Sequence, residues 1–262
     1  TIEARDQTVS TSTYTFASWS DGGAQQHTIT VPAAAQSYVA NYTVVTNPLP
    51  SGLAAGWSFN EVSGTSATDS SGNNNMATLV NGVARTTGNY GGGLTFDGVN
   101  DYLTVPNSAS LNIAGTALTL TLWIKPQALA GGDSVVLGKF WNATMTSPYY
   151  QYGLELAGGT VPVFYVGTTS GQLGAFMGSA LTLDQWSHLA VVFNGSQVQY
   201  YLNGALVTTV PLSATITARS NPFRFGADIA TDQFFKGSLD EVRIYNRTLT
   251  AQEIQTDMTT PF

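Results

Sequence analysis

A loop rich in hard oxygen donors is the most chemically suggestive segment of the sequence. It runs from Asp69 to Asn75 and reads Asp, Ser, Ser, Gly, Asn, Asn, Asn. Calcium takes about six to eight oxygen ligands from carboxylates, amides and backbone carbonyls, and such a loop can supply several of them. The spacing is not that of an EF-hand, and the same residue types form Asx turns that hold no metal. The loop therefore supports two interpretations, a calcium site containing Asp69 with Asn73 or Asn75, or a turn network.

A second candidate cluster lies between Lys139 and Leu156, where aromatic residues crowd around Asn, Thr and Ser. Sugar rings present apolar C–H faces and polar edges, so flat aromatic rings beside amides and carboxylates suit them. The residues that we expect to contact a ligand are Trp141, Asn142 and Tyr149, with Asp133 nearby in sequence and Tyr90 as a weaker candidate. Tyr150 and Tyr152 alternate along an expected strand, and this pattern favours a place for them in the core.

The remaining titratable residues favour structural roles. His27 and His188 are separated by most of the chain, so a multi-histidine zinc site is not expected. His188 lies inside an apolar strand pattern, which favours a hydrogen-bonded sheet residue over a base. Glu241 and Arg243 alternate along one strand face, and we interpret them as a surface or sheet-spanning ion pair. The absence of cysteine excludes disulfides, thiolate metal sites and cysteine nucleophiles.

Composition restricts the class of partner. The 262 residues are 43% hydrophobic and 10% charged, with a formal net charge of −7. This apolar fraction is ample for a buried core and rules out a disordered chain. Three lysines in an acidic chain give no basic stripe, so we expect neither nucleic acid nor a membrane as a partner. No run of about 18 apolar residues is present that could span a bilayer.

The elements that must position these residues are strands. Apolar and polar residues alternate throughout, and about a dozen short apolar segments recur between Gly, Asn, Asp and Ser clusters. This spacing predicts an all-β chain folded as a two-sheet antiparallel sandwich. One short helix is predicted from Thr250 to Met258, where Thr250 and Glu253 form a capping-box pattern.

Turn and proline positions predict the domain organisation. Residues 1–46 read as a small antiparallel β unit of three or four strands, either complete or truncated from an Ig-like or repeat domain. About 46 residues is marginal for an independent core. Residues 47–51 form a linker that contains Pro48 and Pro50, and residues 52–262 form the sandwich.

Five ordered segments carry a resemblance to a known family. They are Ala55–Gly82, Gly92–Pro106, Leu118–Pro126, Asp184–Gly204 and Phe235–Ile254. Together they resemble the laminin G-like, concanavalin A-like jelly-roll domains that occur as accessory modules in secreted bacterial proteins. The segment Ser18–Gly23 (SWSDGG) is similar to short β repeats that precede such modules.

The resemblance implies a calcium site and a location. In the resembling family the first and final strands lie side by side, which would bring the loop after Phe59 close to Asp240. It therefore implies a structural calcium ion held by Asp69, Asn73, Asn75 and Asp240, completed by backbone carbonyls. It also implies a secreted, extracellular protein of bacterial origin, in which this part is a monomeric module of a larger multidomain chain.

The leading functional hypothesis is a non-catalytic, calcium-stabilised carbohydrate-binding module that tethers a secreted parent protein to polysaccharide or glycan. One alternative is a structural or adhesive spacer without a sugar site. Another is a glycoside hydrolase or polysaccharide lyase of the concanavalin A-like fold. Retaining glycosidases need two carboxyl groups about 5 Å apart. The E-x-D-x-x-E strand pattern of glucanases is absent and Glu155 stands alone in its strand, so the sequence leans toward binding.

Overall fold

The structure is a computed structural model that describes residues 1–9, 12–46, 48–128, 132–140, 150–228 and 233–262. The chain divides into two compact units, Pro50–Thr259 and a smaller one that comprises Thr1–Leu49 and Thr260–Phe262. No helix in the described ranges is long and apolar enough to cross a membrane.

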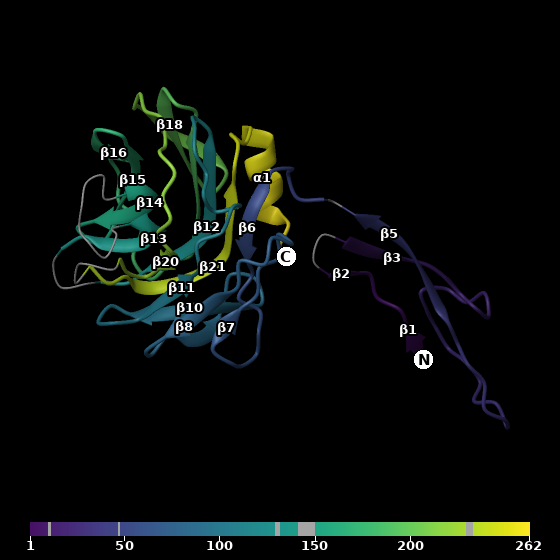
Figure 1. The fold of residues 1–262 in the computed structure, drawn as a ribbon. Helices are drawn as coiled ribbons and strands as arrows, with labels where there is room; N and C mark the ends of the chain where they lie inside the picture. Colours follow the sequence, from purple (N-terminus) through teal and green to yellow (C-terminus); the bar gives the residue numbers. More distant parts are fainter. Residues whose placement is uncertain (10–11, 47, 129–131, 141–149, 229–232) are drawn as a thin grey trace. The chain divides into compact units, whose positions relative to one another are not determined.

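The larger unit is a sandwich of two antiparallel sheets, which confirms the predicted fold class (Figure 1). The first sheet contains, in spatial order, β19 (Ala205–Pro211), β18 (Gln197–Leu202), β17 (Ser187–Phe193), β12 (Leu118–Pro126), β21 (Lys236–Tyr245), β10 (Gly92–Asp97) and β9 (Ala84–Thr87), with β6 (Leu53–Trp57) also paired to β21. The second contains β16 (Gly171–Phe176), β15 (Val161–Thr168), β14 (Tyr150–Ala157), β13 (Ser134–Phe140), β20 (Phe223–Phe225), β11 (Tyr102–Val105), β8 (Ala77–Val80) and β7 (Ser66–Ala67).

Strand β17 shows why the apolar segments form this fold. Leu189, Val191 and Phe193 belong to the main core between the two sheets. Ala190 and Val192 belong to a separate cluster on the opposite face. Because successive side chains of a strand point to opposite faces, a strand buried on both sides reads as a continuous apolar run.

The second face of β17 is covered by the C-terminal helix α1 (Ala251–Thr259), drawn in yellow in Figure 1. Ile254 of the helix is fully buried in that cluster. The predicted capping box is present: Thr250 N donates to Glu253 Oε2 at 2.8 Å and Glu253 N donates to Thr250 Oγ1 at 3.2 Å. Two of the four unpaired donors of the first helical turn are thus satisfied.

A buried charge network joins the last strand to this helix. The ion pair predicted between Glu241 and Arg243 is present at 2.6 Å, but it is buried instead of exposed. Arg243 also lies 3.2 Å from the carboxylate of Asp257 in α1. His188 lies in the sheet, as predicted, as a buried residue of β17; its Nε2 is 3.8 Å from Asp257 and its Nδ1 has no hydrogen-bond partner. These charged groups are therefore part of the packing between sheet and helix.

The smaller unit contains two short sheets. One pairs β1 (Ile2–Glu3) with β4 (Gln26–His27), and the other orders β2 (Gln7–Val9), β3 (Ser12–Trp19) and β5 (Ala40–Thr46). The ring of Phe16 packs against Trp19 at 6.1 Å and against Tyr42 at 6.4 Å, measured between centroids. These aromatic contacts hold the three-stranded sheet together in a unit with little buried apolar surface.

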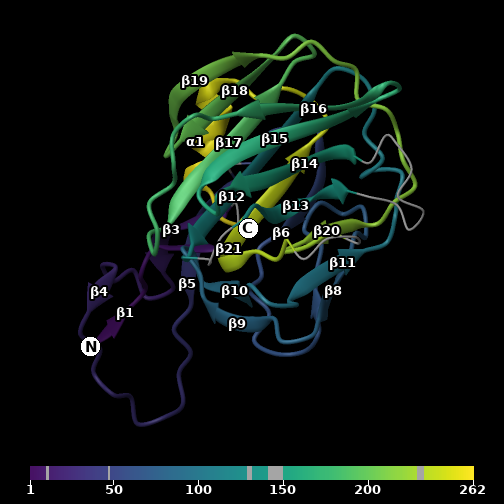
Figure 2. The same cartoon turned by 90° about the vertical axis from the view of Figure 1, so that its left-hand side faces the viewer.

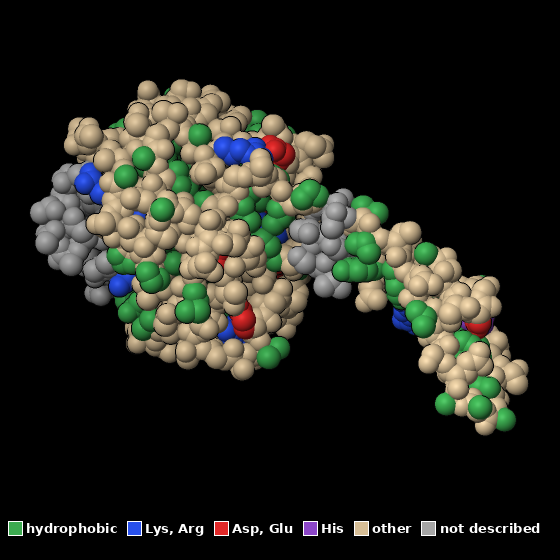
Figure 3. Space-filling view, turned by 45° about the vertical axis from the view of Figure 1, so that its right-hand side comes forward, with side chains coloured by type: hydrophobic (Ala, Val, Ile, Leu, Met, Phe, Trp, Pro, Cys, Tyr) green, Lys and Arg blue, Asp and Glu red, His purple; other side chains and the backbone are tan. Residues whose placement is uncertain are grey.

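Charged side chains are few and scattered on the face of the molecule shown in Figure 3. That distribution agrees with a charged fraction of 10% and shows no basic stripe on this face.

Candidate functional site

A continuous row of residues crosses the outer face of the second sheet, the sheet that faces the viewer in Figure 2. Arg224 of β20 is opposite Gly138 of β13, which is opposite Gly153 of β14. Gly153 is opposite Tyr165 of β15, and Tyr165 is opposite Gly174 of β16. Directly opposed residues of neighbouring strands share one face of a sheet. Since the neighbours of Tyr165 along its strand lie in the core, this row faces outward.

Aromatic rings occupy the space beside two glycines of this row. A Cβ atom at Gly153 would lie 2.0 Å from the ring of Phe140, and one at Gly174 would lie 2.7 Å from the ring of Tyr165. Tyr150 is stacked on Tyr165 with 5.2 Å between ring centroids and 22° between planes. Phe140 meets Tyr150 edge to face at 5.0 Å. The glycines thus provide the space in which three rings form a separate apolar patch outside the main core.

The carboxyl group of Glu155 lies beside this patch. Its side chain is 4% exposed, and its Oε1 has no hydrogen-bond partner. Burial raises the pKa of Glu155 to about 7, against the opposing effect of a hydrogen bond from Tyr150, while the nearby carboxylates of Asp133 and Asp228 raise it further. A buried acceptor without a donor is costly, so this oxygen is ready to accept a hydrogen bond. We call Phe140, Tyr150, Glu155 and Tyr165 the aromatic-carboxylate cluster.

Arg224 in the same row contacts two groups of the protein, while its Nε donor is buried without a hydrogen-bond partner. Its Nη1 donates to the backbone oxygen of Asp228 at 2.9 Å, and its guanidinium lies 4.6 Å from the ring centre of Tyr102. Burial lowers the pKa of this guanidinium. Arg224 therefore forms the opposite flank of the row, where its cation is stacked on an aromatic face.

The sequence-predicted ligand residues fall in different places. Trp141, Asn142 and Tyr149 lie outside the described residues. Asp133 is exposed, accepts a hydrogen bond from Gly158 N at 3.0 Å, and lies near enough to Glu155 to affect its titration. Asp133 is thus brought to the aromatic-carboxylate cluster.

The two strand tyrosines divide between the faces of the sheet. Tyr152 fills the core as predicted, with its hydroxyl donating to Leu111 O at 2.7 Å. Tyr150, expected in the core, packs instead with Phe140 in the outer cluster. The ladder between β13 and β14 is irregular beside this pair, and such bulges redirect side chains. Glu155 was not among the predicted ligand residues because its neighbours come from distant segments. Its place as the only charged residue of its strand was the available signal.

Tyr90 lies on the first sheet, apart from the aromatic-carboxylate cluster. Its backbone N donates to Asp240 Oδ2 at 2.8 Å, and its hydroxyl donates to Met258 O at 3.2 Å. Its ring meets Trp123 edge to face at 5.9 Å. These contacts tie a loop to the last strand and the C-terminal helix, which assigns Tyr90 a structural role.

The loop proposed to hold calcium is satisfied by its own hydrogen bonds. Asp69 Oδ1 accepts from Gly56 N and Ser71 N, each at 2.9 Å, and Oδ2 accepts from Ser71 Oγ, Asn75 N and Asn75 Nδ2, each at 2.8 Å. Asn73 Nδ2 donates to Ala54 O at 3.1 Å. Five donors thus occupy both carboxylate oxygens that a cation would need.

The fourth proposed ligand, Asp240, is not brought to this loop. Strands β6 and β21 are neighbours as expected, but Gly56, which donates to Asp69, is opposite Arg243. Asp240 lies three residues further along β21, about 10 Å at the usual rise per residue. Its carboxyl is fully buried, Oδ1 has no hydrogen-bond partner, and burial raises its pKa to about 7. The residues Asp69, Asn73, Asn75 and Asp240 therefore do not fit one calcium ion in this arrangement.

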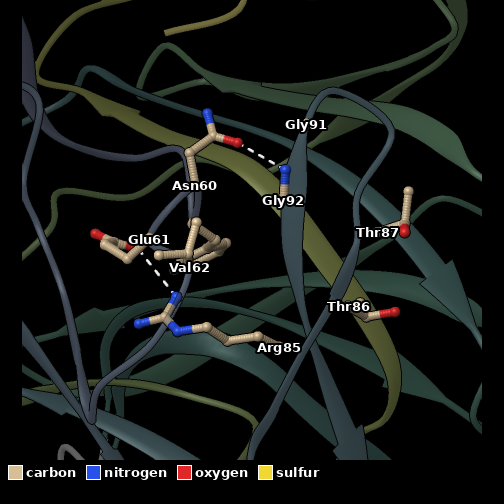
Figure 4. Close-up of a pocket in the computed structure, with 9 residues that line it drawn as sticks. Asn60, Glu61, Val62, Arg85, Thr86, Thr87, Gly91 and Gly92 are labelled. Carbon is tan, nitrogen blue, oxygen red and sulfur yellow. Dashed lines mark hydrogen bonds and ion pairs between the residues drawn. The ribbon is translucent and has the colours of Figure 1, made fainter.

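A separate open pocket of about 440 Å³ lies beside β9 and β10 (Figure 4). Its two charged side chains pair with each other, Glu61 with Arg85 at 3.1 Å, and Asn60 Oδ1 accepts from Gly92 N at 2.7 Å. Its one aromatic lining residue, Phe59, is 1% exposed. Without an accessible ring or an unpaired charge in its described lining, this pocket is less suited to a sugar than the aromatic-carboxylate cluster.

Several solved structures are similar to this chain. Domain 4 of AbnA, an extracellular arabinanase of Geobacillus stearothermophilus in complex with arabinotriose, has a TM-score of 0.62 at 21% identity, and the match covers 79% of this chain and 98% of that domain. The binding domain of Paraclostridial Mosquitocidal Protein 1 has a TM-score of 0.63 at 17% identity, covering 79% and 52% of the two chains. Trypanosoma rangeli sialidase in complex with sialic acid has a TM-score of 0.60 at 17% identity, covering 82% and 33%. At these identities the likeness shows the fold alone.

Two sequence matches complete the comparison. Adhesion G-protein coupled receptor V1 of Danio rerio is 25% identical over 145 residues, which cover 52% of this chain and 2% of the receptor. This chain thus spans a small fraction of that relative. A family model matches residues 96–255, which confirms the laminin G-like resemblance of the sequence motifs. The chain belongs to the concanavalin A-like lectin/glucanases superfamily.

Proposed function

We propose that this protein is a non-catalytic carbohydrate-binding module whose ligand contacts the aromatic-carboxylate cluster. The main observation behind this proposal is the half-buried ring of Tyr165, which stacks on Tyr150. Beside this ring lies the buried Oε1 atom of Glu155, which has no hydrogen-bond partner. A sugar can place a C–H face on such a ring and donate a hydroxyl hydrogen to the carboxyl group. Asp133 lies two residues before Val135, which is opposite Glu155, and is proposed as a further acceptor.

The comparisons support this proposal. The superfamily is described by its lectins and glucanases, and one solved domain of this fold is in complex with arabinotriose. We place the module in a secreted parent protein that it holds on polysaccharide or glycan. Calcium is left out of the proposal because the loop around Asp69 satisfies its carboxylate internally.

The test is retention on insoluble polysaccharides and a glycan array, followed by titration of the best ligand. Tyr165→Ala should weaken binding roughly tenfold or more, the equivalent of about 1.4 kcal/mol. Tyr38→Ala, which removes a half-buried tyrosine from the small unit, is the matched control and should bind normally. Thermal unfolding of both variants separates lost binding from lost folding.

Each other result has a definite meaning. If Tyr165→Ala binds the glycan as tightly as the unmodified protein, the binding site must lie elsewhere. No retention of the unmodified protein on any glycan would contradict the proposal and favour the spacer alternative. Steady release of reducing sugars, lost in Glu155→Gln, would favour a glycoside hydrolase over a binding module.

A further inference from the structure

We infer that Arg219, beside the buried ammonium group of Lys139, binds the carboxylate group of an acidic saccharide at the end of β13 and β14. This inference rests on the proposed function and adds a charged group to its ligand. It follows from two cations that lie together while their hydrogen bonds in the described chain are with neutral groups.

Lys139 carries a fully buried ammonium group whose described partners are all neutral. Its Nζ atom donates to Asn107 Oδ1 and to the backbone oxygen of Arg219, each at 2.6 Å, and to Asn112 Oδ1 at 3.4 Å. Burial lowers the pKa of Lys139 to about 8, and no charged group of the described chain opposes this effect. A buried cation without a counter-ion is costly, and a nearby negative charge favours its charged form. An anion bound beside Lys139 would therefore be stabilised.

Arg219 supplies hydrogen-bond donors that the described chain leaves free. Its backbone N donates to Asn112 Oδ1 at 2.9 Å and to Gln151 Oε1 at 3.0 Å, so the backbone is held at this position. Its guanidinium group, in contrast, makes no hydrogen bond or ion pair with a described residue, and its Nε is buried without a partner. The side chain is partly exposed, so a ligand can reach it. A planar guanidinium group can bind a carboxylate through two parallel hydrogen bonds.

These two cations adjoin the aromatic part of the aromatic-carboxylate cluster. Lys139 directly precedes Phe140 in β13, and Phe140 is opposite Tyr150 in β14. Asn221, two residues after Arg219, donates from its Nδ2 to the backbone oxygen of Phe140 at 3.3 Å. A saccharide that contacts the aromatic rings can therefore extend its charged group toward Arg219.

The carboxyl groups of the cluster lie toward the other end of the same strands. Glu155 is four residues from Gln151 along β14, about 13 Å at the usual rise per residue, and Asp133 is six residues before Lys139. Charges in solvent that are more than about 8 Å apart are largely screened at physiological ionic strength. Arg224, which is opposite β13 one residue before Lys139, is a further cation and would not repel an anion. The local charges thus favour a carboxylate at Arg219.

The test compares acidic polysaccharides with their own neutral derivatives. Polygalacturonate, alginate and hyaluronate carry sugar carboxylates, and their methyl esters keep the same sugars and linkages without the charge. At least one of the three should retain the unmodified protein, and should bind it roughly tenfold more tightly than its ester does. Polyglutamate, which carries carboxylates without sugar rings, should not retain the protein.

Variants connect the preference for the acidic polymer to these residues. Arg219→Gln should remove the preference and leave binding of the ester unchanged. Because the guanidinium group makes no hydrogen bond with a described residue, this variant should unfold at the same temperature as the unmodified protein. Lys139→Met should also reduce the preference, and thermal unfolding shows whether this variant folds. Lys236→Gln is the matched control, because it removes one positive charge from β21 in the first sheet and should keep the preference.

The outcomes separate this inference from the proposed function. Retention on neutral polysaccharides alone, or a preference for the acidic polymer that survives Arg219→Gln, would overturn the inference while leaving carbohydrate binding intact. Equal retention on polyglutamate would indicate general binding of polyanions and would overturn it as well. Failure to retain the protein on any polysaccharide, acidic or neutral, would instead contradict the proposed function.

Discussion

The rings of Tyr150 and Tyr165 stack across two neighbouring strands, with 5.2 Å between their centroids and 22° between their planes. The stack fixes the ring plane of Tyr165, whose side chain is half-buried. A ligand that binds a ring already held in place loses less side-chain entropy on binding. The stack depends in turn on Phe140, which meets Tyr150 edge to face and lies over Gly153.

Gly153→Ala should disrupt this platform. The new Cβ would lie 2.0 Å from the ring of Phe140, so the ring must move or the strands must separate. Overpacking of this kind lowers the free energy of unfolding by about 1–3 kcal/mol. Urea unfolding measures the loss, and glycan titration measures the accompanying loss of affinity.

A double-mutant cycle tests the cause of that loss. In a Phe140→Leu background the smaller side chain leaves room for the methyl group, so Gly153→Ala should cost less there than in the unmodified protein. Coupled residues in contact typically show interaction energies of about 0.5–3 kcal/mol. Additive costs would mean that the glycine is required for a reason other than the ring above it.

The stability of the larger unit should fall as pH rises from about 4.5 to 7. Burial raises the pKa of Glu155 from 4.5 to about 7 and that of Asp240 from 3.8 to about 7. Both carboxyls bind a proton more tightly in the folded state, so their favourable contribution is complete below the unfolded pKa and is lost as pH passes the folded pKa. The shift at Glu155 corresponds to a loss on the order of 3 kcal/mol. Denaturant unfolding at several pH values measures how the free energy of unfolding changes with pH.

Glu155→Gln distinguishes the contribution of Glu155 to this pH dependence from that of Asp240. Gln resembles the protonated acid, so the variant should match the unmodified protein near pH 5 and be more stable at pH 8. Asp240→Asn should remove the remaining dependence of the free energy of unfolding on pH. A Glu155→Gln protein destabilised equally at both pH values would show that the carboxyl stays ionised in the folded state.

Asp69→Asn should destabilise the protein without involving calcium. The carboxylate accepts five hydrogen bonds, including two from Asn75 and one from Gly56. The amide of Asn keeps one acceptor oxygen, but its NH₂ group replaces the second oxygen and would face N–H and O–H donors. This should lower the free energy of unfolding by about 1–3 kcal/mol. Unfolding in calcium and in a chelator should give the same midpoint for each protein. A calcium-dependent stabilisation that Asp69→Asn abolishes would restore the metal site implied by the sequence.

The sequence predicted the fold well because the signals are local. Alternation in segments such as β12 and β17, together with the turn residues between them, predicts a two-sheet sandwich, and Thr250 with Glu253 predicts the start of the helix. The adjacency of the first and last strands of the domain was also expected and is observed, with Trp57 opposite Val242. Strands and helix starts depend on the spacing of apolar residues and on capping residues, both of which are visible in the sequence.

The candidate site was predicted less completely because it depends on register across strands. No pattern in the sequence places Gly138, Gly153 and Tyr165 in one row, since they come from three strands whose pairing is fixed by tertiary packing. The same reason separates Asp240 from Asp69, because adjacent strands do not guarantee adjacent side chains. Asp133 was identified from its neighbours in sequence, whereas Glu155 is recognisable only once the strands are paired.

Asp257 should contribute more to stability than any exposed ion pair of the helix. Its carboxylate is 1% exposed and lies 3.2 Å from Arg243, whose other side pairs with Glu241 at 2.6 Å. Removing one partner of a buried ion pair leaves a charge without compensation, so Asp257→Ala should cost about 3–5 kcal/mol. Glu253→Gln is the matched control, because Glu253 pairs with the partly exposed Arg247 and Gln preserves the capping box; its cost should stay below about 1 kcal/mol. Asp257→Asn keeps the side-chain shape if the alanine variant does not fold, and hydrogen exchange then reports the opening of α1. Equal costs for the two positions would mean that apolar contacts, such as those of Ile254, hold the helix on the sheet instead of the charge network.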